Sequence, residues 1–550
     1  MEVFDVVVLG CGAAGMTAAI RAQAAGARVG LFEKSELVGG TAAWSGGMVW
    51  IPDNPLMREA GIADSREQAM TYMESLSLGA IDDAALATFL DNGPAMVSWM
   101  AEHTPVVFDI LRGFPDYHPE NPGGLPDGGR SMECPLFPFV ELGEWAAKVT
   151  KGPQLSGAMT ISETPLGRGA PEGISAEELA KRKIRDERGT GQALAGRLLK
   201  GCLDRGIVPR TGMRAMALLT EGDAVTGVRF ETVDGPVEVR ARSGVVIASG
   251  GFEWDPELVS AFLRGPLERP ASPRSNTGDG LRMAMRVGVS LGNMREAWWA
   301  PTIDVPMPDG SVAAWLVNGE RTRPHSIMVN GAGRRFANEA VNYNAFGAAF
   351  HTVDVTHFRY ENNRAWLLFD HEYWTRYGLA GSRGEVPGWI TRAESLAGLA
   401  AELGVSADAL GETVERWNAN TADGRDPDFG RGTSAVDKWW GDPDYGDGPA
   451  ATLGAVATAP FYAVRVRSGA LGTKGGPRTD EHAQVLDVDG QPIQGLFAAG
   501  NAAAVSSMGM TYGGAGGTLG PALVSGYLAG HFAAQDKSAV STTPSTRKAD

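Results

Sequence analysis

The N-terminal end of the chain combines a strand pattern, a glycine motif and a helix pattern in direct succession. Phe4–Leu9 is an apolar run typical of a buried strand, and Gly10–Gly15 directly after it reads GxGxxG. The stretch from Met16 to Ala25 then has helix character, and Arg28 to Phe32 reads as a second strand. The motif alone is weak, because 74 glycines in 550 residues give roughly one match by chance. Its strand–turn–helix setting is complete, so the sequence predicts a βαβ unit.

Each glycine of this motif has an expected task. We expect Gly10 to make the tight turn, Gly12 to let the backbone approach a pyrophosphate, and Gly15 to allow close helix–strand packing. Glu33, at the end of the second strand, can accept the hydroxyls of a ribose. A carboxylate there disfavours a 2′-phosphate, so FAD or NAD is favoured over NADP. A βαβ unit without a ligand is the alternative.

The sequence after Glu33 favours a flavin nucleotide. Lys34–Gly47 continues as a glycine-rich, hydroxyl-bearing segment, whereas nicotinamide folds usually proceed to another βα unit. Two further short apolar strands end in small residues, at Gly244–Gly251 and Gly495–Asn501. Ligands bind at the carboxyl edge of such a sheet. The residues expected to contact FAD are Gly10, Gly12, Ala13, Ala14, Gly15, Glu33, Lys34, Gly40, Thr41, Ser45, Gly46, Gly47, Ala248, Gly250, Gly500, Asn501, Gly517, Thr518 and Leu519.

A glycine-dense loop near the C-terminus is the expected place of the chemistry. It runs from Met508 to Pro521, contains Tyr512, and leads into an apolar, helix-like segment. Glycines let backbone N–H groups approach a ligand, and a helix N-terminus offers unpaired donors. Tyr512 and the backbone N–H of Gly516 could therefore bind one ligand oxygen together. The alternative is a helix-entry loop with a packed aromatic ring.

Composition and charge exclude several classes of protein. Hydrophobic residues make up 43% of the chain, enough for two domains, and the net charge of −16 argues against nucleic acid as a partner. No apolar run approaches about 18 residues, so no transmembrane segment is expected. The first strand begins at residue 4, which leaves no room for a signal peptide, and we expect a cytoplasmic protein. The three cysteines are scattered, so they predict neither a metal site nor a haem site.

The predicted architecture is α/β, with a Rossmann-like FAD-binding domain that is split in sequence by an inserted α+β catalytic domain. The expected boundaries are 1–302 and 466–535 for the two parts of the FAD-binding domain, 303–465 for the inserted domain, and 536–550 for a disordered tail rich in Ser, Thr and Lys. Such an insertion places a cleft over the flavin ring, and clefts between domains commonly bind ligands.

The segment Ser326–Tyr343 carries a resemblance to a known group of proteins. Its Met-Val-Asn, Gly-Arg-Arg-Phe and Asn-Glu elements resemble the fumarate reductase/succinate dehydrogenase flavoprotein superfamily. In the dicarboxylate enzymes of that superfamily an arginine follows the Asn-Glu glutamate by four residues and transfers a proton. Here that position is Tyr343, which argues against a dicarboxylate substrate. The histidine that binds FAD covalently in succinate dehydrogenases is missing around Ala43-Trp44, so the resemblance implies non-covalent FAD.

Tyr343, the segment Gly472–Gly476 and the Tyr512 loop together resemble the 3-ketosteroid Δ1-dehydrogenase branch. The resemblance implies FAD-dependent α,β-dehydrogenation of a cyclic ketone, in which a tyrosine removes the α-proton and the β-hydride passes to flavin N5. Tyr343 would be that base, Tyr512 and Gly516 would hold the carbonyl oxygen, and Tyr117 in the N-terminal insertion would assist. The loop here has Gly513-Gly514-Ala515 without a proline, a departure from the usual steroid-enzyme loop.

Several alternatives stay open at this stage. The substrate is a steroid or a smaller, cyclohexanone-type ring, and the site could run in reverse as a flavin-dependent enone reductase. A protein that binds flavin and a ligand without turnover is a third hypothesis. Tyr343 could instead be a packing residue on a helix face, and Tyr117 an exposed or capping loop residue. Arg334 and Arg335 are expected to be surface or ion-pair residues, and Asn338 and Glu339 to hold the local fold. The electron acceptor is not identified by the sequence.

Overall fold

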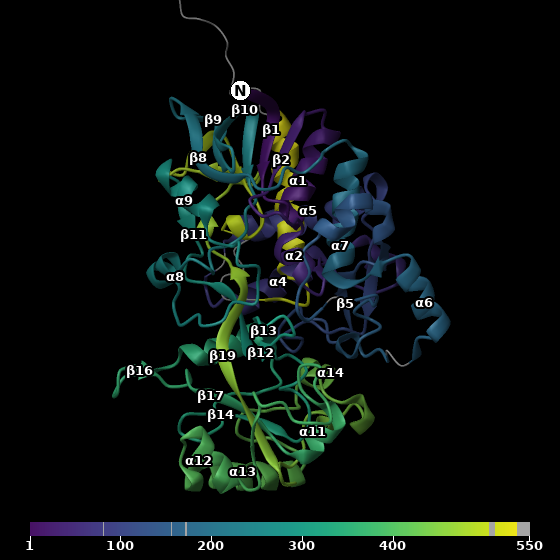
Figure 1. Cartoon of the computed structure of the whole chain (residues 1–550), viewed down its shortest axis with the longest axis vertical. Coiled ribbons are helices and arrows are strands. Elements are labelled where there is room, and N and C mark those ends of the chain that lie inside the picture. Colours follow the sequence, from purple (N-terminus) through teal and green to yellow (C-terminus); the bar gives the residue numbers. More distant parts are fainter. Residues whose placement is uncertain (81, 156, 171–172, 505–511, 536–550) are drawn as a thin grey trace, which may run out of the picture.

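The computed structural model describes residues 1–80, 82–155, 157–170, 173–504 and 512–535. A seven-stranded sheet forms the upper part of the molecule in Figure 1. Its main path runs β2-β1-β10-β22-β21, where β1 pairs in parallel with β2 and β10, and β10 pairs in parallel with β22. The strands of this sheet are β1 (Glu2–Leu9), β2 (Val29–Phe32), β8 (Arg214–Glu221), β9 (Ala224–Thr232), β10 (Gly235–Ile247), β21 (Gln484–Leu486) and β22 (Pro492–Ala498).

The three strands expected to end at one ligand-binding edge are therefore neighbours. Val6, Val7 and Val8 of β1 are fully buried, as are Val245, Val246 and Ile247 of β10. A parallel sheet covered on both faces gives such near-continuous apolar strands. Because β1, β10 and β22 run in the same direction, their carboxyl ends meet at one edge, as the sequence predicted.

Two helices from opposite ends of the chain cover the same side of this sheet. They are α1 (Ala13–Ala24) and α15 (Leu519–Gln535). A side chain at Gly526 or Gly530 of α15 would meet the backbone of Ala14 or Ala18 at 2.4 and 2.2 Å, respectively. Only glycine permits this approach of the two backbones. The C-terminal helix thus places the loop before it beside the N-terminal glycine motif.

A second, antiparallel sheet of six strands extends through the lower part of the molecule (Figure 1). Its path is β13-β12-β19-β17-β14, with β18 paired to β19. The strands are β12 (Ala297–Pro306), β13 (Val312–Leu316), β14 (Ser326–Asn330), β17 (Ala365–Phe369), β18 (Thr391–Ala393) and β19 (Phe461–Thr473). Two apolar clusters pack on its two faces, one around Phe346, Phe350 and Tyr373, and the other around Leu410, Val414 and Trp417.

Strand β19 connects the two parts of the molecule. Residues 462–466 pair with β17, whereas Arg467–Thr473 pair with β12. The predicted domain boundaries at 302/303 and 465/466 fall inside β12 and β19, and the division of the chain at these points stays a prediction. The predicted tail, 536–550, lies outside the described residues.

The insertion between β3 and α7 supplies small elements beside the upper sheet. A three-stranded sheet consists of β3 (Val49–Trp50), β4 (Asp109–Arg112) and β5 (Gly128–Glu133). The α-helices that follow α1, up to α9, are α2 (Gly40–Trp44), α3 (Pro55–Glu59), α4 (Arg66–Leu76), α5 (Asp83–His103), α6 (Ala176–Ile184), α7 (Thr190–Asp204), α8 (Pro256–Phe262) and α9 (Asp279–Arg286). The lower part adds α10 (Tyr343–Ala348), α11 (His371–Tyr377), α12 (Leu396–Leu403), α13 (Ala407–Ala422) and α14 (Ala435–Trp439).

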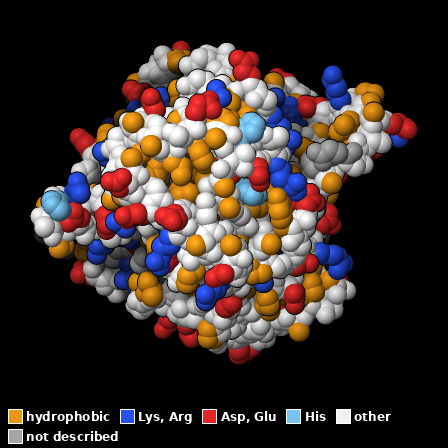
Figure 2. All heavy atoms as spheres, turned by 90° about the horizontal axis from the view of Figure 1, so that it is seen from below, with side chains coloured by type: hydrophobic (Ala, Val, Ile, Leu, Met, Phe, Trp, Pro, Cys, Tyr) orange, Lys and Arg blue, Asp and Glu red, His pale blue; other side chains and the backbone are white. Residues whose placement is uncertain are grey.

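The face of the molecule where α12 and α13 lie carries charges of both signs. Figure 2 shows acidic and basic side chains interspersed there with apolar ones. In the part of the chain that the structure describes, no helix has the length and apolarity needed to cross a membrane.

Candidate functional site

The glycine motif after β1 has the geometry that its sequence predicted. Gly10 has a φ of +108°, and a side chain there would meet the Ala248 carbonyl oxygen at 2.4 Å. A side chain at Gly15 would meet the Gly10 oxygen at 1.9 Å, which explains the need for glycine where α1 packs on β1. Open space lies around the position of a side chain on Gly12. The middle glycine therefore exposes its backbone to the cavity described next.

A long cavity begins at this motif and ends at a group of tyrosines. It encloses about 2090 Å³ of empty space, including its open mouth. Of the predicted FAD contacts, Gly10, Gly12, Ala13, Ala14, Glu33, Lys34, Gly40, Thr41, Ser45, Gly46, Gly47, Ala248, Gly250, Gly500, Asn501, Thr518 and Leu519 line it. Gly15 and Gly517 are absent from the wall; a side chain at Gly517 would meet the Tyr512 ring at 3.0 Å. These two glycines serve packing rather than the cavity surface.

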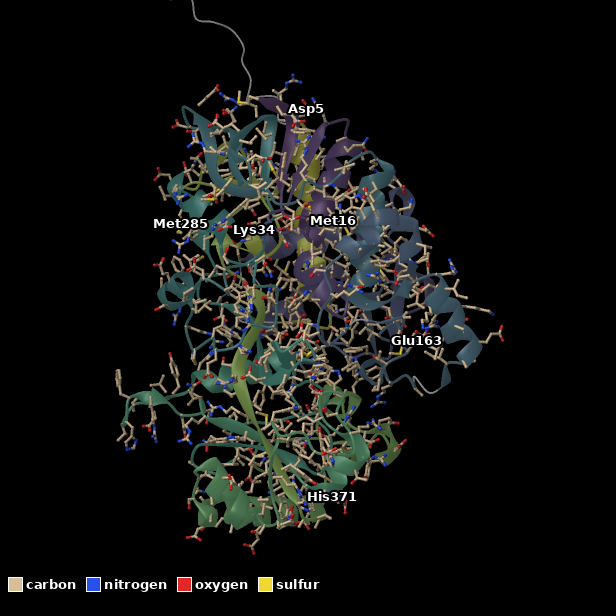
Figure 3. All side chains as sticks on the ribbon, in the orientation of Figure 1. Asp5, Met16, Lys34, Glu163, Met285 and His371 are labelled. Carbon is tan, nitrogen blue, oxygen red and sulfur yellow. The ribbon has the colours of Figure 1, made fainter. Side chains whose placement is uncertain are left out.

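Glu33 and Lys34 lie at the end of the cavity where the sequence predicts the nucleotide, called the nucleotide end below. The Glu33 carboxylate accepts hydrogen bonds from the Cys11 and Ser35 backbone N–H groups, both at 2.9 Å. Burial raises the pKa of Glu33, and these hydrogen bonds act in the opposite direction. Lys34 Nζ lies 2.8 Å from Asp279. Figure 3 shows Lys34 between the upper sheet and the lower part of the molecule.

The residues present fit a flavin dinucleotide. The wall offers an open glycine backbone at Gly12, a half-buried carboxylate at Glu33, and hydroxyls at Thr41 and Ser45. These are the groups that a pyrophosphate and a ribose require. Among the described residues that line the cavity there is neither histidine nor cysteine, and non-covalent binding stays a prediction.

The far end of the cavity brings three predicted tyrosines together. The hydroxyl oxygens of Tyr117 and Tyr343 lie 3.4 Å apart. The ring centroid of Tyr512 lies 5.1 Å from that of Tyr117 and 5.4 Å from that of Tyr343. All three residues are buried, since their exposed fractions are 1%, 6% and 4% in chain order. Tyr117 is therefore not the exposed loop residue that the sequence left as an alternative.

A buried ion-pair network fixes the loop that carries Tyr117. Asp116 accepts from Trp50 Nε1 and from Arg130, each at 2.8 Å. Arg130 binds Asp64 as well, with its side chain fully buried. The Tyr117 backbone N–H donates to the Gly513 oxygen at 2.9 Å. The network thereby holds Tyr117 against the loop that carries Tyr512.

Tyr343 occupies the first position of α10. Asn342 caps this helix, because its side chain accepts from the Ala345 N–H. The same Asn342 side chain binds His118 Nε2 at 2.9 Å and so links the two tyrosine-bearing segments. Glu339, just before, is fully buried and pairs with Arg335 and Arg431. The Asn-Glu element thus holds the local fold, as expected from the sequence.

Gly516 and Tyr512 form the turn before α15. Gly516 has a φ of +101°, and a side chain there would meet the Met48 backbone at 2.5 Å. No residue with a β-carbon fits this turn. The Tyr512 hydroxyl accepts from Thr518 Oγ1 at 3.0 Å. Of the predicted loop, 508–511 lies outside the described residues.

Several wall residues of the tyrosine end were not predicted as site residues. Trp440 stacks on Tyr343 at 6.3 Å between centroids and meets the edge of Tyr117 at 5.3 Å. The remaining walls come from Met48, Phe114, Pro153, Gln154, Leu155, Leu166, Ala314, Leu316, Asn318 and Leu471. These residues come from segments far apart in sequence, and no local motif marks them.

Burial dominates the protonation behaviour of the phenols. It raises the pKa of Tyr117 and Tyr343 well above the usual range, and it also raises the pKa of Tyr512. Hydrogen bonding with Thr518 and with the Gly516 backbone acts in the opposite direction on Tyr512. The neighbouring phenols raise the pKa of Tyr343 further, because a second negative charge beside the first is unfavourable. A phenolate at Tyr343 therefore needs stabilisation from its surroundings.

Other predictions concern residues outside this cavity. Cys11, Cys134 and Cys202 are free and buried, as expected. No group of three or more His, Cys, Asp or Glu side chains that could bind a metal ion occurs among the described residues.

Comparisons with known proteins find matches along nearly the whole chain. The model of the FAD binding domain family matches residues 5–519. The 4-oxocyclohexanecarboxylate 2-dehydrogenase of Sinomonas cyclohexanicum is 41% identical, over 96% of this chain and 92% of that protein. The 3-oxosteroid 1-dehydrogenase of Mycobacterium tuberculosis is 38% identical, over 97% of this chain and 99% of that protein. The crystal structure of 3-ketosteroid Δ1-dehydrogenase from Sterolibacterium denitrificans, in complex with 1,4-androstadiene-3,17-dione, has a TM-score of 0.90 at 34% identity, covering 97% of this chain and 100% of that one.

Proposed function

Because this chain belongs to the FAD binding domain family, in its 3-ketosteroid Δ1-dehydrogenase-like branch, it is a FAD-dependent oxidoreductase acting on a CH–CH group, and we propose that its substrate is an uncharged cyclic ketone. The reaction introduces a double bond between the α- and β-carbons beside the carbonyl. The contact of Tyr117 with Tyr343, 3.4 Å apart at the buried end of the cavity, carries this proposal.

Tyr343 takes the α-proton in this proposal. The α-carbon–hydrogen bond breaks, and the proton moves to the Tyr343 phenolate oxygen. A tyrosine has an ordinary pKa of about 10, and burial raises the pKa of Tyr343 further. Tyr117 assists because its hydroxyl is within hydrogen-bonding distance of Tyr343, so the two oxygens share the negative charge before the proton arrives.

Tyr512 and Gly516 hold the carbonyl oxygen. As the α-proton leaves, charge develops on that oxygen, and preorganised donors stabilise it. One such donor is worth about 3 kcal/mol in comparable sites. Both residues line the cavity beside Tyr343, and Gly516 has the left-handed backbone of its turn. The two donors act on the same oxygen and are not additive.

Bound FAD supplies the acceptor for the hydride that leaves the β-carbon. The residues that would hold it are those of the glycine motif, Glu33, and the segment Gly40–Gly47, all on the cavity wall except Cys11, Gly15 and Ala43. The buried tyrosine end keeps water away from the reacting carbons, since Trp440, Leu316 and Phe114 cover it.

The walls of the tyrosine end favour a substrate without charge. Lys34 is the only Lys or Arg among the described wall residues; it lies at the nucleotide end and pairs with Asp279. Gln154, a polar wall residue, already bonds the Leu316 backbone through both its amide nitrogen and its oxygen. A carboxylate here would be buried without a cation, which is costly. The relatives named above include a steroid enzyme and a 4-oxocyclohexanecarboxylate dehydrogenase, whose six-membered ring bears a carboxylate, so ring size and the charge of the substrate are both left to experiment.

An anaerobic experiment tests the proposal. The oxidised yellow protein is mixed first with androstenedione and then with cyclohexanone, and flavin absorbance is followed. Bleaching with either ketone supports desaturation and sorts the ring size. No bleaching with any ketone, together with reoxidation of the reduced enzyme by an enone, would favour the reductase instead. Tyr445→Phe, at an exposed tyrosine, serves as the control variant that leaves the reaction unchanged.

A further inference from the structure

His118 directly follows Tyr117, and its half-buried imidazole lies against the segment that carries Tyr343. Its Nε2 atom lies 2.9 Å from the side-chain nitrogen of Asn342, the residue before Tyr343. The described wall residues of the cavity do not include His118, so we expect no contact between the imidazole and the substrate. Any effect of His118 on the reaction therefore acts through Asn342.

The hydrogen bonds of Asn342 determine which of its two side-chain groups faces His118. The side-chain oxygen of Asn342 accepts from the Ala345 N–H at 3.0 Å, as the cap of α10. The side-chain NH2 group therefore points the other way, where it donates to the Tyr117 backbone oxygen at 3.4 Å and meets His118 Nε2. The opposite orientation would place oxygen against oxygen at Tyr117 and NH2 against N–H at Ala345.

This orientation fixes the protonation of His118. Because the NH2 group of Asn342 is a donor, His118 Nε2 must accept, and an imidazole nitrogen accepts only when it carries no proton. The imidazole is therefore neutral, with its proton on Nδ1. Asn342 is fully buried, so loss of this acceptor would leave one of its N–H groups buried without a partner, which is unfavourable.

A second set of contacts fixes the backbone of His118. Its N–H donates to the Tyr72 hydroxyl at 3.1 Å, and Tyr72, a fully buried residue of α4, donates to the Gly513 oxygen at 2.6 Å. The same Gly513 oxygen accepts from the Tyr117 N–H. The loop is therefore held on α4 and on the glycine-rich turn, and the imidazole connects it to the cap of α10.

Burial and one carboxylate act in opposite directions on His118. Burial has the larger effect and lowers the pKa of the imidazole, whereas the Glu120 carboxylate favours the protonated form. The helices that these contacts reach, α4 and α10, bring the phenols Tyr72 and Tyr343, whose pKa values burial raises well above the usual range. Asp116, two residues before His118, has a pKa raised to about 6 by burial and titrates in the same range as a histidine. The neutral imidazole that the hydrogen bonds require is thus the form present at neutral pH.

We propose that His118 is a positioning residue for the base: its neutral imidazole holds Asn342 and thereby sets Tyr343 at hydrogen-bonding distance from Tyr117. The inference rests on the proposed function, since it concerns the residue proposed to take the α-proton. His118 itself neither touches the ketone nor takes the α-proton. Protonation of the imidazole breaks the contact with Asn342, because both facing nitrogens then carry hydrogen. The geometry of the base is therefore lost as the pH falls through the titration of His118.

Two substitutions separate the acceptor from the ring. His118→Gln keeps an acceptor near the position of Nε2 but cannot be protonated, whereas His118→Phe keeps a ring without an acceptor. Steady-state kcat and KM are measured with a ring ketone and an excess of an artificial electron acceptor. We expect His118→Phe to lower kcat at least about tenfold with little change in KM, because a small displacement of a reacting group has an effect of this size. His118→Gln should retain most of kcat at neutral pH, and His357→Gln, at an exposed histidine, is the matched control that leaves kcat unchanged.

The pH dependence gives a readout that a merely structural role would not move. The ratio of kcat in the wild type to kcat in His118→Gln is measured between about pH 5 and pH 8, where histidines titrate. Asp116 and the phenols are present in both proteins, so their titration cancels in this ratio. The ratio should be constant near neutrality and fall at least about tenfold toward acid pH, as the protonated wild type approaches the rate of His118→Phe.

A purely structural role predicts another result. Both variants would then lose kcat equally, in parallel with lower melting temperature and flavin content, and the ratio would not change with pH; that outcome overturns the inference. A His118→Phe variant with the kcat of the wild type overturns it as well. If His118→Phe does not fold, the ratio of the wild type to His118→Gln decides alone, and a ratio that is constant over the whole range overturns the inference.

A ketone-free measurement separates this inference from the proposed function. The eight histidines of the chain are labelled with ¹⁵N, and the resonances of His118 are identified by their absence from the spectrum of His118→Gln. They should show a neutral ring with its proton on Nδ1 at neutral pH. A proton on Nε2, or a charged ring, overturns the inference whether or not any ketone reacts. Wild-type protein that shows the expected form but oxidises no ring ketone contradicts the proposed function alone.

Discussion

The hydroxyl oxygens of Tyr117 and Tyr343 lie 3.4 Å apart although 226 residues separate them in the chain. Tyr117 belongs to the loop held by Asp116 and Arg130, and Tyr343 begins α10 beside the lower sheet. The pair therefore forms only when the N-terminal insertion and the segment after β14 fold against one another. The distance between the two hydroxyl oxygens therefore depends on how these two segments pack against one another.

Tyr343→Phe should abolish most of the reaction. Removal of one general base lowers rates by about 10²- to 10⁴-fold, and the phenyl ring preserves the packing with Trp440. Turnover and α-proton exchange should both fall, while flavin content and melting temperature stay near wild type. Tyr117→Phe should lower turnover less, since the Tyr117 hydroxyl contacts the base Tyr343 rather than the substrate. A Tyr343→Phe variant with full turnover would remove the assignment of the base.

Activity should rise from neutral toward alkaline pH. Only unprotonated Tyr343 can take a proton, and burial together with the two neighbouring phenols raises the pKa of Tyr343 well above its usual range. Below that pKa the phenolate fraction grows about tenfold per pH unit. The profile of kcat/KM should therefore climb without reaching a plateau near pH 8. A flat profile over this range, with the protein still folded, would count against a tyrosinate base.

Gly516→Ala should destabilise the protein and impair substrate binding together. The residue has a φ of +101°, and the new methyl carbon would lie 2.5 Å from the Met48 backbone, which cannot move as a flexible side chain can. A loss of about 2 kcal/mol or more in unfolding free energy is expected. Gly411→Ala, in α13 with open space around it, is the matched control and should stabilise by about 0.5–1 kcal/mol. Equal melting temperatures for the two variants would contradict the left-handed turn at Gly516.

Much of the nucleotide end could be predicted from sequence, because its signals are local. Gly10, Gly12 and Gly15 act within one strand–turn–helix unit, and their spacing within that unit indicates what each does. Tyr343 and Tyr512 were found through their motifs, and the structure brings both to one cavity.

The rest of the site depends on long-range packing that no local pattern encodes. Trp440 and Leu316 reach the tyrosines only through the pairing of β12 with β13 and through the position of α14. Long-range contacts of this kind become visible only when the structure gives the neighbours of each side chain.

Asp116→Asn should disturb both stability and catalysis. The carboxylate accepts from Trp50, Arg130 and the Leu125 N–H, and an amide would present a donor to one of them. Breaking one side of a buried ion pair costs about 3 kcal/mol, measured as the free energy of unfolding. Because Tyr117 follows directly, kcat should fall as well.

Asp447→Asn is the control for that substitution. Asp447 pairs with Arg168 at the surface, where its side chain is 90% exposed. An exposed pair contributes at most about 1 kcal/mol. If Asp116→Asn changed unfolding and kcat no more than Asp447→Asn does, the network around Arg130 would not be what holds Tyr117 in place.

The charge of the substrate should matter more than its ring size. A carboxylate on the ketone ring would enter a cavity end whose described wall offers Tyr343, Trp440 and Leu316 but no Lys or Arg. Burial of an unpaired carboxylate costs several kcal/mol, so kcat/KM for 4-oxocyclohexanecarboxylate should be at least about a hundredfold below that for its methyl ester. The two compounds share the ring and the carbonyl, so steady-state rates compare charge alone. If the free acid reacts as fast as the ester, the cavity supplies a cation or an open path to water at that end, and a carboxylate-bearing ring becomes the better assignment of the substrate.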